Sequence, residues 1–272
     1  MKNIFLTGAS SFLGNNLIPK LVNYKIYGLE HQTPLMNFEN LISVKVEKED
    51  LNSFYNDNNI DLIVHLAANS NISNNQNDFE NLLNTNVIFG NDVLLSAKNS
   101  PVKKIISAGS YSQYIDETPS NFYKISKQIF EMLLSNFSSL NNFRSTSLCF
   151  SDIYGPNDKR NKLIPYLLKN ENKKSVSLNS DGLGYFSPIH INDATDSIIF
   201  EVENESSQIF KKKLICSELL SVKEFINIYK TVRNKSFTPI YANKNRLSSY
   251  KPNNLTSDVV LKIDLETGLK NL

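Results

Sequence analysis

Short apolar runs alternate along this chain with longer segments in which apolar residues recur every three or four positions. The strand-like runs are Ile4–Leu6, Lys25–Leu29, Ser43–Val46, Leu62–Val64, Ile105–Ile106 and Ser147–Phe150. Helical spacing separates most of them, most clearly over Leu82–Lys98 and Tyr123–Leu134. This alternation predicts an α/β, Rossmann-type fold, in which helices cover both faces of a doubly wound parallel sheet. Such sheets bind ligands at the carboxyl ends of their strands.

Composition narrows the class of protein. The chain has 272 residues, 40% of them hydrophobic, and a net charge of +2, which suits one larger domain or one with a small appendage. Its two cysteines, Cys149 and Cys216, form no disulfide framework and show no metal-ligand spacing, so we expect core cysteines, a reducing compartment and no metal. With no leader and no apolar run of membrane-spanning length, we expect a cytoplasmic protein. The near-neutral charge disfavours nucleic-acid binding.

The turn after the first strand carries the first chemical signal. Its sequence is Thr7-Gly8-Ala9-Ser10-Ser11-Phe12-Leu13-Gly14, and helical spacing follows it. Gly8 can adopt the tight backbone conformation of the turn, and Gly14 allows the helix to pack closely while free N–H groups face a pyrophosphate. Ser11 stands where a dinucleotide loop usually has its middle glycine, and its hydroxyl is itself a candidate phosphate ligand. The pattern predicts a dinucleotide site formed by Gly8 and residues 10–14.

The end of the second strand bears on which dinucleotide binds. Glu30 lies there, 22 residues after Gly8. A carboxylate at this place accepts hydrogen bonds from the adenosine ribose hydroxyls and repels a 2′-phosphate, which favours NAD over NADP. Neighbouring His31 can soften this discrimination, so NADP stays open, and the alternative is a solvated glutamate at a strand end.

A tyrosine and a lysine downstream predict proton transfer beside the dinucleotide. Tyr123 and Lys127 are four residues apart, so on a helix they project from one face. A tyrosine has a pKa near 10, and an adjacent ammonium favours its phenolate. Tyr123 would then take a hydroxyl proton as hydride leaves carbon, and return it on reduction. A Tyr-x-x-x-Lys pair also arises easily on an exposed helix, so the pair is informative only in combination with the loop.

Together these motifs make the chain similar to the extended short-chain dehydrogenase/reductase family, which contains nucleotide-sugar epimerases, dehydratases and 4-keto reductases. Further ordered matches carry the resemblance: Asp50-Leu51, Val64-His65-Leu66-Ala67-Ala68, Asn86-Val87, Ser110, Ile153-Tyr154-Gly155-Pro156 and Pro188-Ile189-His190-Ile191-Asn192-Asp193. The closing Leu265–Lys270 segment resembles the last helix of nucleotide-sugar epimerases.

The resemblance implies roles for several residues. Asp50 and Leu51 would flank the adenine, Leu66, Ala67 and Ala68 would line the central section of the cofactor, and Phe150 would lie near the nicotinamide. Asn86 and Ile153 belong to the same implied cofactor site, and Lys127 would also hold the nicotinamide ribose. Ser110 would complete the catalytic group by hydrogen-bonding the reacting oxygen, with Ser107 and Ser112 as rivals.

Departures from the family pattern concern the substrate. Tyr123 comes only 13 positions after Ser110, so the covering loop Ile115–Asn121 is short. Cys149 stands where relatives often have an arginine. Asp152 stands where many have an asparagine that contacts the substrate. Phe186-Ser187 stands where an Arg-Asp pair frequently helps to hold the diphosphate. Asp152, Lys159 and Arg160 are therefore the candidate substrate ligands, with Lys162 completing a basic cluster whose alternative is a solvated loop.

The remaining segments are expected to be structural. His65 and His190 are interpreted as packing residues, and Lys211–Lys213 as a solvated turn. Ser221 and Glu224 have the spacing of a helix capping box. We expect an NAD(P)-binding Rossmann domain over residues 1–150 and a small mixed substrate-binding subdomain over 151–272, partly interleaved with it.

The leading functional hypothesis is an NAD-dependent enzyme that transfers hydride at C4 of a nucleotide-linked sugar, as a 4-epimerase. The alternative is an NADPH-dependent 4-keto-6-deoxy nucleotide-sugar reductase of the kind that makes CDP-linked dideoxy sugars. A dehydratase is disfavoured because Tyr111 and Ser112 do not supply the Asp-Glu pair of those enzymes. A binding scaffold without turnover is a third hypothesis. By family analogy, a homodimer would form through a four-helix interface of Leu82–Lys98 and Tyr123–Leu134.

Overall fold

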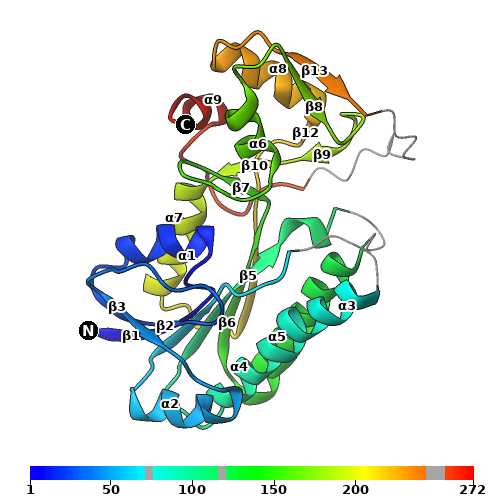
Figure 1. The fold of residues 1–272 in the computed structure, drawn as a ribbon. Helices are drawn as coiled ribbons and strands as arrows, with labels where there is room; N and C mark the ends of the chain where they lie inside the picture. Colours follow the sequence, from blue (N-terminus) through cyan, green and yellow to red (C-terminus); the bar gives the residue numbers. More distant parts are fainter. Residues whose placement is uncertain (71–75, 116–120, 243–254) are drawn as a thin grey trace. The chain divides into compact units, whose positions relative to one another are not determined.

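The computed structural model describes residues 1–70, 76–115, 121–242 and 255–272 (Figure 1). The chain divides into two compact units. The first unit comprises residues 1–150 and 195–213, and the second comprises residues 151–194 and 214–272. Of the predicted covering loop at 115–121, residues 116–120 lie outside the described residues.

A seven-stranded sheet forms the centre of the first unit. Its strands are β1 (Lys2–Thr7), β2 (Tyr24–Leu29), β3 (Leu41–Val44), β4 (Leu62–His65), β5 (Lys104–Ser110), β6 (Arg144–Phe150) and β11 (Phe210–Ile215), in the order β11-β6-β5-β4-β1-β2-β3. The pairs among β1 to β6 are parallel. The predicted doubly wound parallel sheet is therefore confirmed. Strand order reverses between β1 and β4, the position where such sheets bind ligands.

Helices cover the sheet because its strands are apolar on both faces. One core cluster joins Phe5 and Ile63 of the sheet to α2 (Leu51–Asp57), α4 (Phe89–Ala97) and α5 (Phe122–Asn141). α1 (Phe12–Leu17) and the second half of α7 (Ile191–Glu203) lie together on the opposite face (Figure 1). Lys20, which follows α1, donates to Thr195 Oγ1 (2.7 Å) of α7.

The helices extend beyond the predicted ranges. α3 (Gln76–Leu83), a π-helical segment (Asn84–Ile88) and α4 run consecutively over the region predicted as Leu82–Lys98. α5 continues to Asn141 rather than ending at Leu134, and Asn142 closes it in the left-handed conformation (φ 50°). Polar residues after Leu134 weaken the sequence signal, but buried Phe137 continues the apolar stripe and keeps the helix packed.

The second unit is a smaller mixed structure. It contains α6 (Leu163–Asn170), α8 (Val222–Val232) and α9 (Leu265–Lys270), with β7 (Asp152–Tyr154), β8 (Ser175–Leu178), β9 (Tyr185–Phe186), β10 (Pro188–His190), β12 (Leu220–Ser221) and β13 (Thr238–Tyr241). The strands pair as β10-β7, β12-β9 and β13-β8. The predicted capping box is confirmed, because the Glu224 N–H donates to Ser221 Oγ (3.2 Å) and the Ser221 N–H donates to Glu224 Oε2 (2.7 Å). Among the helices of the described segments, none combines the length and the apolar character needed to cross a bilayer.

The expectation of a solvated turn at Lys211–Lys213 is wrong. These residues belong to β11, and Lys211 Nζ and Lys213 Nζ lie 3.1 and 2.7 Å from carboxylate oxygens of Glu201 on α7. Lys104 Nζ is 3.7 Å from the same carboxylate, which is fully buried. Burial opposes ionisation of Glu201, but hydrogen bonds from Lys213 and Lys211 outweigh it and lower the pKa. Because side chains alternate along a strand, Lys211 and Lys213 project from the same face of β11. A run of three lysines in the sequence does not show that it forms a strand.

We expect Glu201→Gln to lower the free energy of unfolding by about 3–5 kcal/mol, because it leaves three ammonium groups without their common anion. Urea denaturation at pH 7 measures this change. Lys213→Gln is the matched control and should cost clearly less, since two lysines remain on the carboxylate; equal losses would contradict the account. Because the pKa of Glu201 is depressed, its contribution persists above the ordinary glutamate range and is lost as the pH falls through the folded-state pKa.

Candidate active site

The turn after β1 is built around two glycines. Gly8 has φ +69°, and a Cβ there would lie 2.6 Å from the Ala67 backbone nitrogen. A Cβ on Gly14 would lie 2.6 Å from the carbonyl oxygens of both Gly8 and Ala9. Larger residues at either place would push the turn away from the β4 loop or from the start of α1. The backbone can therefore come close to a ligand here, as the sequence predicted.

Side chains at the ends of β1 and β4 fasten these neighbouring loops together. Thr7 Oγ1 lies 2.8 Å from His65 Nδ1 and accepts the Ala67 N–H (3.2 Å). Burial, with a smaller effect from the charge of Lys127, lowers the pKa of His65 to about 3. His65 is thus a neutral packing residue, as expected. The structure brings Gly8 and the Leu66–Ala68 segment side by side at the point where strand order reverses.

Ser11 fulfils a local structural role. It is the N-cap of α1, and its Oγ accepts the Gly14 N–H (3.0 Å). A hydroxyl that accepts in this way keeps its hydrogen for donation to an anionic oxygen. The side chain in place of the usual middle glycine therefore stabilises the helix start and is compatible with a phosphate nearby. Ser10, Phe12 and Leu13 are partly exposed around it.

Two predicted cofactor residues are better described as supports. Leu51 has no exposed surface and packs in the core cluster with Phe5 and Tyr55, so it cannot touch a ligand in this arrangement. Asn86, in the π-helical segment, accepts the Asn69 N–H (2.7 Å) and donates to the Asn69 carbonyl (2.9 Å). It thereby fixes the backbone that follows the Leu66–Ala68 segment. Asp50 directly precedes α2, and Phe150 ends β6.

The three predicted catalytic residues lie on β5 and α5. Ser110 ends β5, whereas Tyr123 and Lys127 occupy the first two turns of α5. Lys127 is buried, and its Nζ donates to the Ala108 carbonyl (2.6 Å), two residues before Ser110. Burial lowers the pKa of Lys127 to about 8. This bond fixes the face of α5 that carries Lys127 against β5.

The rival serines differ in position. Ser107 is buried within β5, opposite His65 and Ser147 of the adjacent strands. Ser112 instead pairs with Ser110, because their hydroxyl oxygens lie 2.8 Å apart. Ser110 is thus the last residue of β5, at the carboxyl end of the sheet, and Ser112 is hydrogen-bonded to it.

Gln113 and Glu131 hold this turn and were not identified from the sequence. Gln113 Oε1 accepts the Ser110 N–H (3.2 Å), and Gln113 Nε2 donates to the Tyr114 hydroxyl (2.9 Å). That hydroxyl donates to Glu131 of α5, which also accepts from Ser147 Oγ (2.6 Å). A Ser-x-x-Gln capping pattern and a carboxylate four residues after Lys127 were the available signals.

The predicted substrate residues belong to the second unit. Asp152 and Lys159 are both exposed. Arg160, in contrast, donates hydrogen bonds to both carboxylate oxygens of Asp158 (2.8 Å each) and to the Ile153 carbonyl (2.7 Å). Its guanidinium therefore braces the loop after β7. Phe186 is half-buried and packs edge-on against the buried ring of Phe225, with ring centroids 4.9 Å apart.

Ser187 is likewise internal to the second unit. It is buried, accepts the Ser217 N–H (2.8 Å) and donates to the Ser217 carbonyl (2.9 Å). His190 is buried against the ring of Tyr154, with centroids 5.5 Å apart, in agreement with the packing role expected for it.

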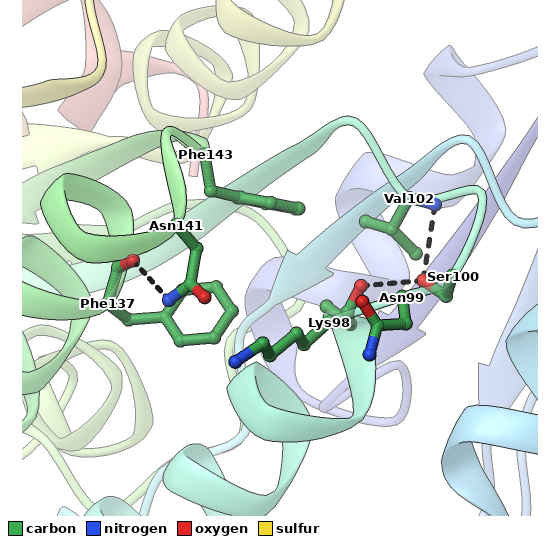
Figure 2. Close-up of a pocket in the computed structure, with 8 residues that line it drawn as sticks. Lys98, Asn99, Ser100, Val102, Phe137, Asn141 and Phe143 are labelled. Atoms are coloured by element: carbon green, nitrogen blue, oxygen red, sulfur yellow. Dashed lines mark hydrogen bonds between the residues drawn. The ribbon is translucent and has the colours of Figure 1, made fainter.

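A small pocket of about 200 Å³ lies at the end of the seven-stranded sheet opposite to the glycine turn and Ser110. Figure 2 shows it between the end of α4, the turn before β5 and the end of α5, with Lys98, Phe137 and Phe143 among its lining residues. Val102 lies two residues before β5 and Phe143 directly before β6, so this pocket is at the amino ends of the strands. Parallel sheets bind cofactors at the other end.

The predicted group Ser110, Tyr123 and Lys127 thus lies on β5 and α5 of a doubly wound parallel sheet. Residues 4–211 match the NAD dependent epimerase/dehydratase family, and the chain belongs to that family. A trifunctional UDP-glucose 4,6-dehydratase/3,5-epimerase/4-keto-reductase of Arabidopsis thaliana is 28% identical over 235 residues, which cover 74% of this chain and 35% of that protein. The chain thus spans about a third of the length of that relative.

Two further proteins resemble this chain over most of their own length. CDP-abequose synthase of Yersinia pseudotuberculosis is 26% identical over 216 residues, 75% of each chain. The structure of UDP-glucuronic acid 4-epimerase from Bacillus cereus, in complex with UDP-glucuronic acid and NAD, aligns with a TM-score of 0.82 and 19% identity, covering 98% of this chain and 96% of that one. The structural likeness confirms the fold.

Proposed function

We propose that this protein is an NAD-dependent epimerase that acts at C4 of a nucleotide-linked sugar. One observation carries the proposal: Lys127, one helical turn after Tyr123, is buried and donates to the carbonyl of Ala108, two residues before Ser110. The family match and the similarity to a 4-epimerase solved with a UDP-sugar and NAD support it. The second unit would hold the sugar nucleotide, with Asp152, Lys159 and Arg160 as candidate contacts.

The chain's own residues supply binding and proton transfer. Gly8, Ser11 and Gly14 would hold the pyrophosphate, and the Leu66–Ala68 segment would line the central part of the cofactor. NAD, when bound, supplies the hydride acceptor and donor. Tyr123 would take the proton of the C4 hydroxyl and return it, while the cationic form of Lys127 favours the phenolate. Ser110 would donate a hydrogen bond to the reacting oxygen.

A 4-keto nucleotide-sugar reductase is the second candidate. The similarity to CDP-abequose synthase extends over three-quarters of both chains, a more balanced match than that to the plant protein. The same residues would serve, with Tyr123 acting only as the proton donor. An external reduced dinucleotide would then be consumed in each turnover.

The first unit also carries an apolar surface that supports the predicted homodimer. Ile88, Leu95, Met132 and Leu140 are 52–78% exposed on the π-helical segment, α4 and α5. Their spacing of seven residues on one helix and eight on the other places them on continuous faces. We infer a dimer through a four-helix interface, which sedimentation analysis measures directly. A cytoplasmic location stays a prediction from cysteine usage.

The decisive experiment is to denature the purified protein, identify any released dinucleotide, and assay UDP-glucose, UDP-glucuronic acid and UDP-N-acetylglucosamine for interconversion with their C4 epimers. We expect retained NAD and interconversion without added cofactor. Stoichiometric oxidation of NADH or NADPH with a CDP-4-keto-6-deoxy sugar would instead establish the reductase. Absence of dinucleotide binding would refute both.

A further inference from the structure

Both oxygens of the Glu30 carboxylate are engaged by residues of β3 and the position after it. Ser43 Oγ donates to Glu30 Oε2 (2.8 Å), and Lys45 Nζ lies 3.2 Å from Glu30 Oε1. The Glu30 backbone N–H donates to the Val44 carbonyl (2.8 Å), which continues the β2–β3 pairing to this point. Glu30 is thus held in place at the carboxyl end of β2, next to β1 and its glycine turn.

The exposures of the two charged side chains differ greatly. The Glu30 side chain is 19% exposed, whereas that of Lys45 is 75% exposed. The serine hydroxyl and the ammonium lower the pKa of Glu30, so the carboxylate is ionised at neutral pH. The pair therefore presents a fixed negative charge and, about one hydrogen-bond length away, a solvent-accessible positive charge.

These charges act oppositely on a 2′-phosphate. A carboxylate alone repels that dianion and accepts bonds from a free ribose diol, which gives NAD its advantage. An ammonium within about 4 Å of the same position attracts the dianion with a comparable energy. A lysine on a flexible stem can also turn from Glu30 toward a phosphate without disturbing the core.

We propose that Lys45 is a specificity-determining residue that offsets Glu30, so that the protein binds NADP(H) as well as NAD(H). This inference rests on the proposed function only through the location of the dinucleotide site. Lys45 does not match any motif of the resemblance, and its role follows from β3 pairing with β2.

Calorimetric titration of the full chain with NAD⁺ and NADP⁺, after removal of bound nucleotide, tests the proposal. We expect the wild-type dissociation constants to differ by no more than about tenfold. Lys45→Gln should raise the ratio of the NADP⁺ to the NAD⁺ constant by about tenfold, mainly by weakening NADP⁺. Glu30→Gln should lower that ratio, and the effect of Lys45→Gln should shrink in high salt.

Lys25→Gln is the matched control, because it removes an exposed lysine near the amino end of β2, the strand whose carboxyl end Glu30 follows, and should leave the ratio unchanged. Equal ratios for the wild type and Lys45→Gln would overturn the inference while leaving the NAD site intact. Failure of the wild type to bind either dinucleotide would overturn the cofactor site itself. The two failures are therefore distinguishable, and neither depends on knowing the sugar.

Discussion

Lys127→Met should lower turnover strongly while leaving the protein at least as stable as the wild type at pH 7. Methionine removes the ammonium that favours the Tyr123 phenolate, so we expect turnover to fall by about a thousandfold. Burial lowers the pKa of Lys127 from 10.5 to about 8, so keeping the buried ammonium charged costs about 3 kcal/mol of the free energy of unfolding. Methionine removes this cost, but loss of the hydrogen bond to the Ala108 carbonyl offsets about 1 kcal/mol of the stabilisation.

The sign of the pH dependence follows from the same shift. Between about pH 8 and 10.5 the unfolded chain holds a proton on Lys127 that the folded chain has released, so wild-type stability rises with pH relative to the variant. The stability advantage of Lys127→Met should therefore be largest at pH 7 and fade toward pH 10, as calorimetric melting at several pH values measures. A variant that melts well below the wild type at pH 7 would show that Lys127 is chiefly structural.

Tyr123→Phe should retain the dinucleotide and lose interconversion. The substitution deletes one hydroxyl from a half-buried ring at the start of α5, so the fold and NAD affinity should be preserved. Removing a general acid–base group lowers the rate by about a hundredfold to ten-thousandfold. The measurement is turnover in the sugar-nucleotide assay together with the dissociation constant for NAD⁺.

Tyr166→Phe is the matched control for this change. It removes a tyrosine hydroxyl that donates to the Ser177 carbonyl on the second unit (2.7 Å), outside the proposed catalytic group. Its turnover should equal that of the wild type. Full activity of Tyr123→Phe would remove the proton-transfer role and favour a dinucleotide-binding scaffold.

Several details of the site were within reach of the sequence because they depend on local chemistry. The positive φ of Gly8 and the capping box of Ser221 and Glu224 follow from residue type and spacing. The burial of His65 as a packing residue follows from its place at the end of an apolar strand. Ser110-x-x-Gln113 is a capping pattern of the same kind, and it could have been predicted.

Other details depend on contacts between distant segments. Lys211 and Lys213 appear solvated in a run of three lysines, but Glu201 lies opposite them once α7 packs near β11. Leu51 matches a position tied to a ligand in relatives, yet its complete burial beside Phe5 and Tyr55 makes it a core residue. Phe186 is half-buried and packs against the buried ring of Phe225. Glu131 gains its importance only because Tyr114 and Ser147 approach it.

The sequence by itself determined the parallel α/β sheet, the glycine turn and the Tyr123–Lys127 pair, because apolar periodicity and helical spacing are local properties of the chain. Only the tertiary structure decided which charges meet. The ionisation of Lys127, the anchoring of Ser110 through Gln113 and the pairing of Glu30 with Lys45 depend on burial and on segments brought together by strand order. Electrostatic energies change steeply with distance and solvent exposure, and a linear sequence specifies neither.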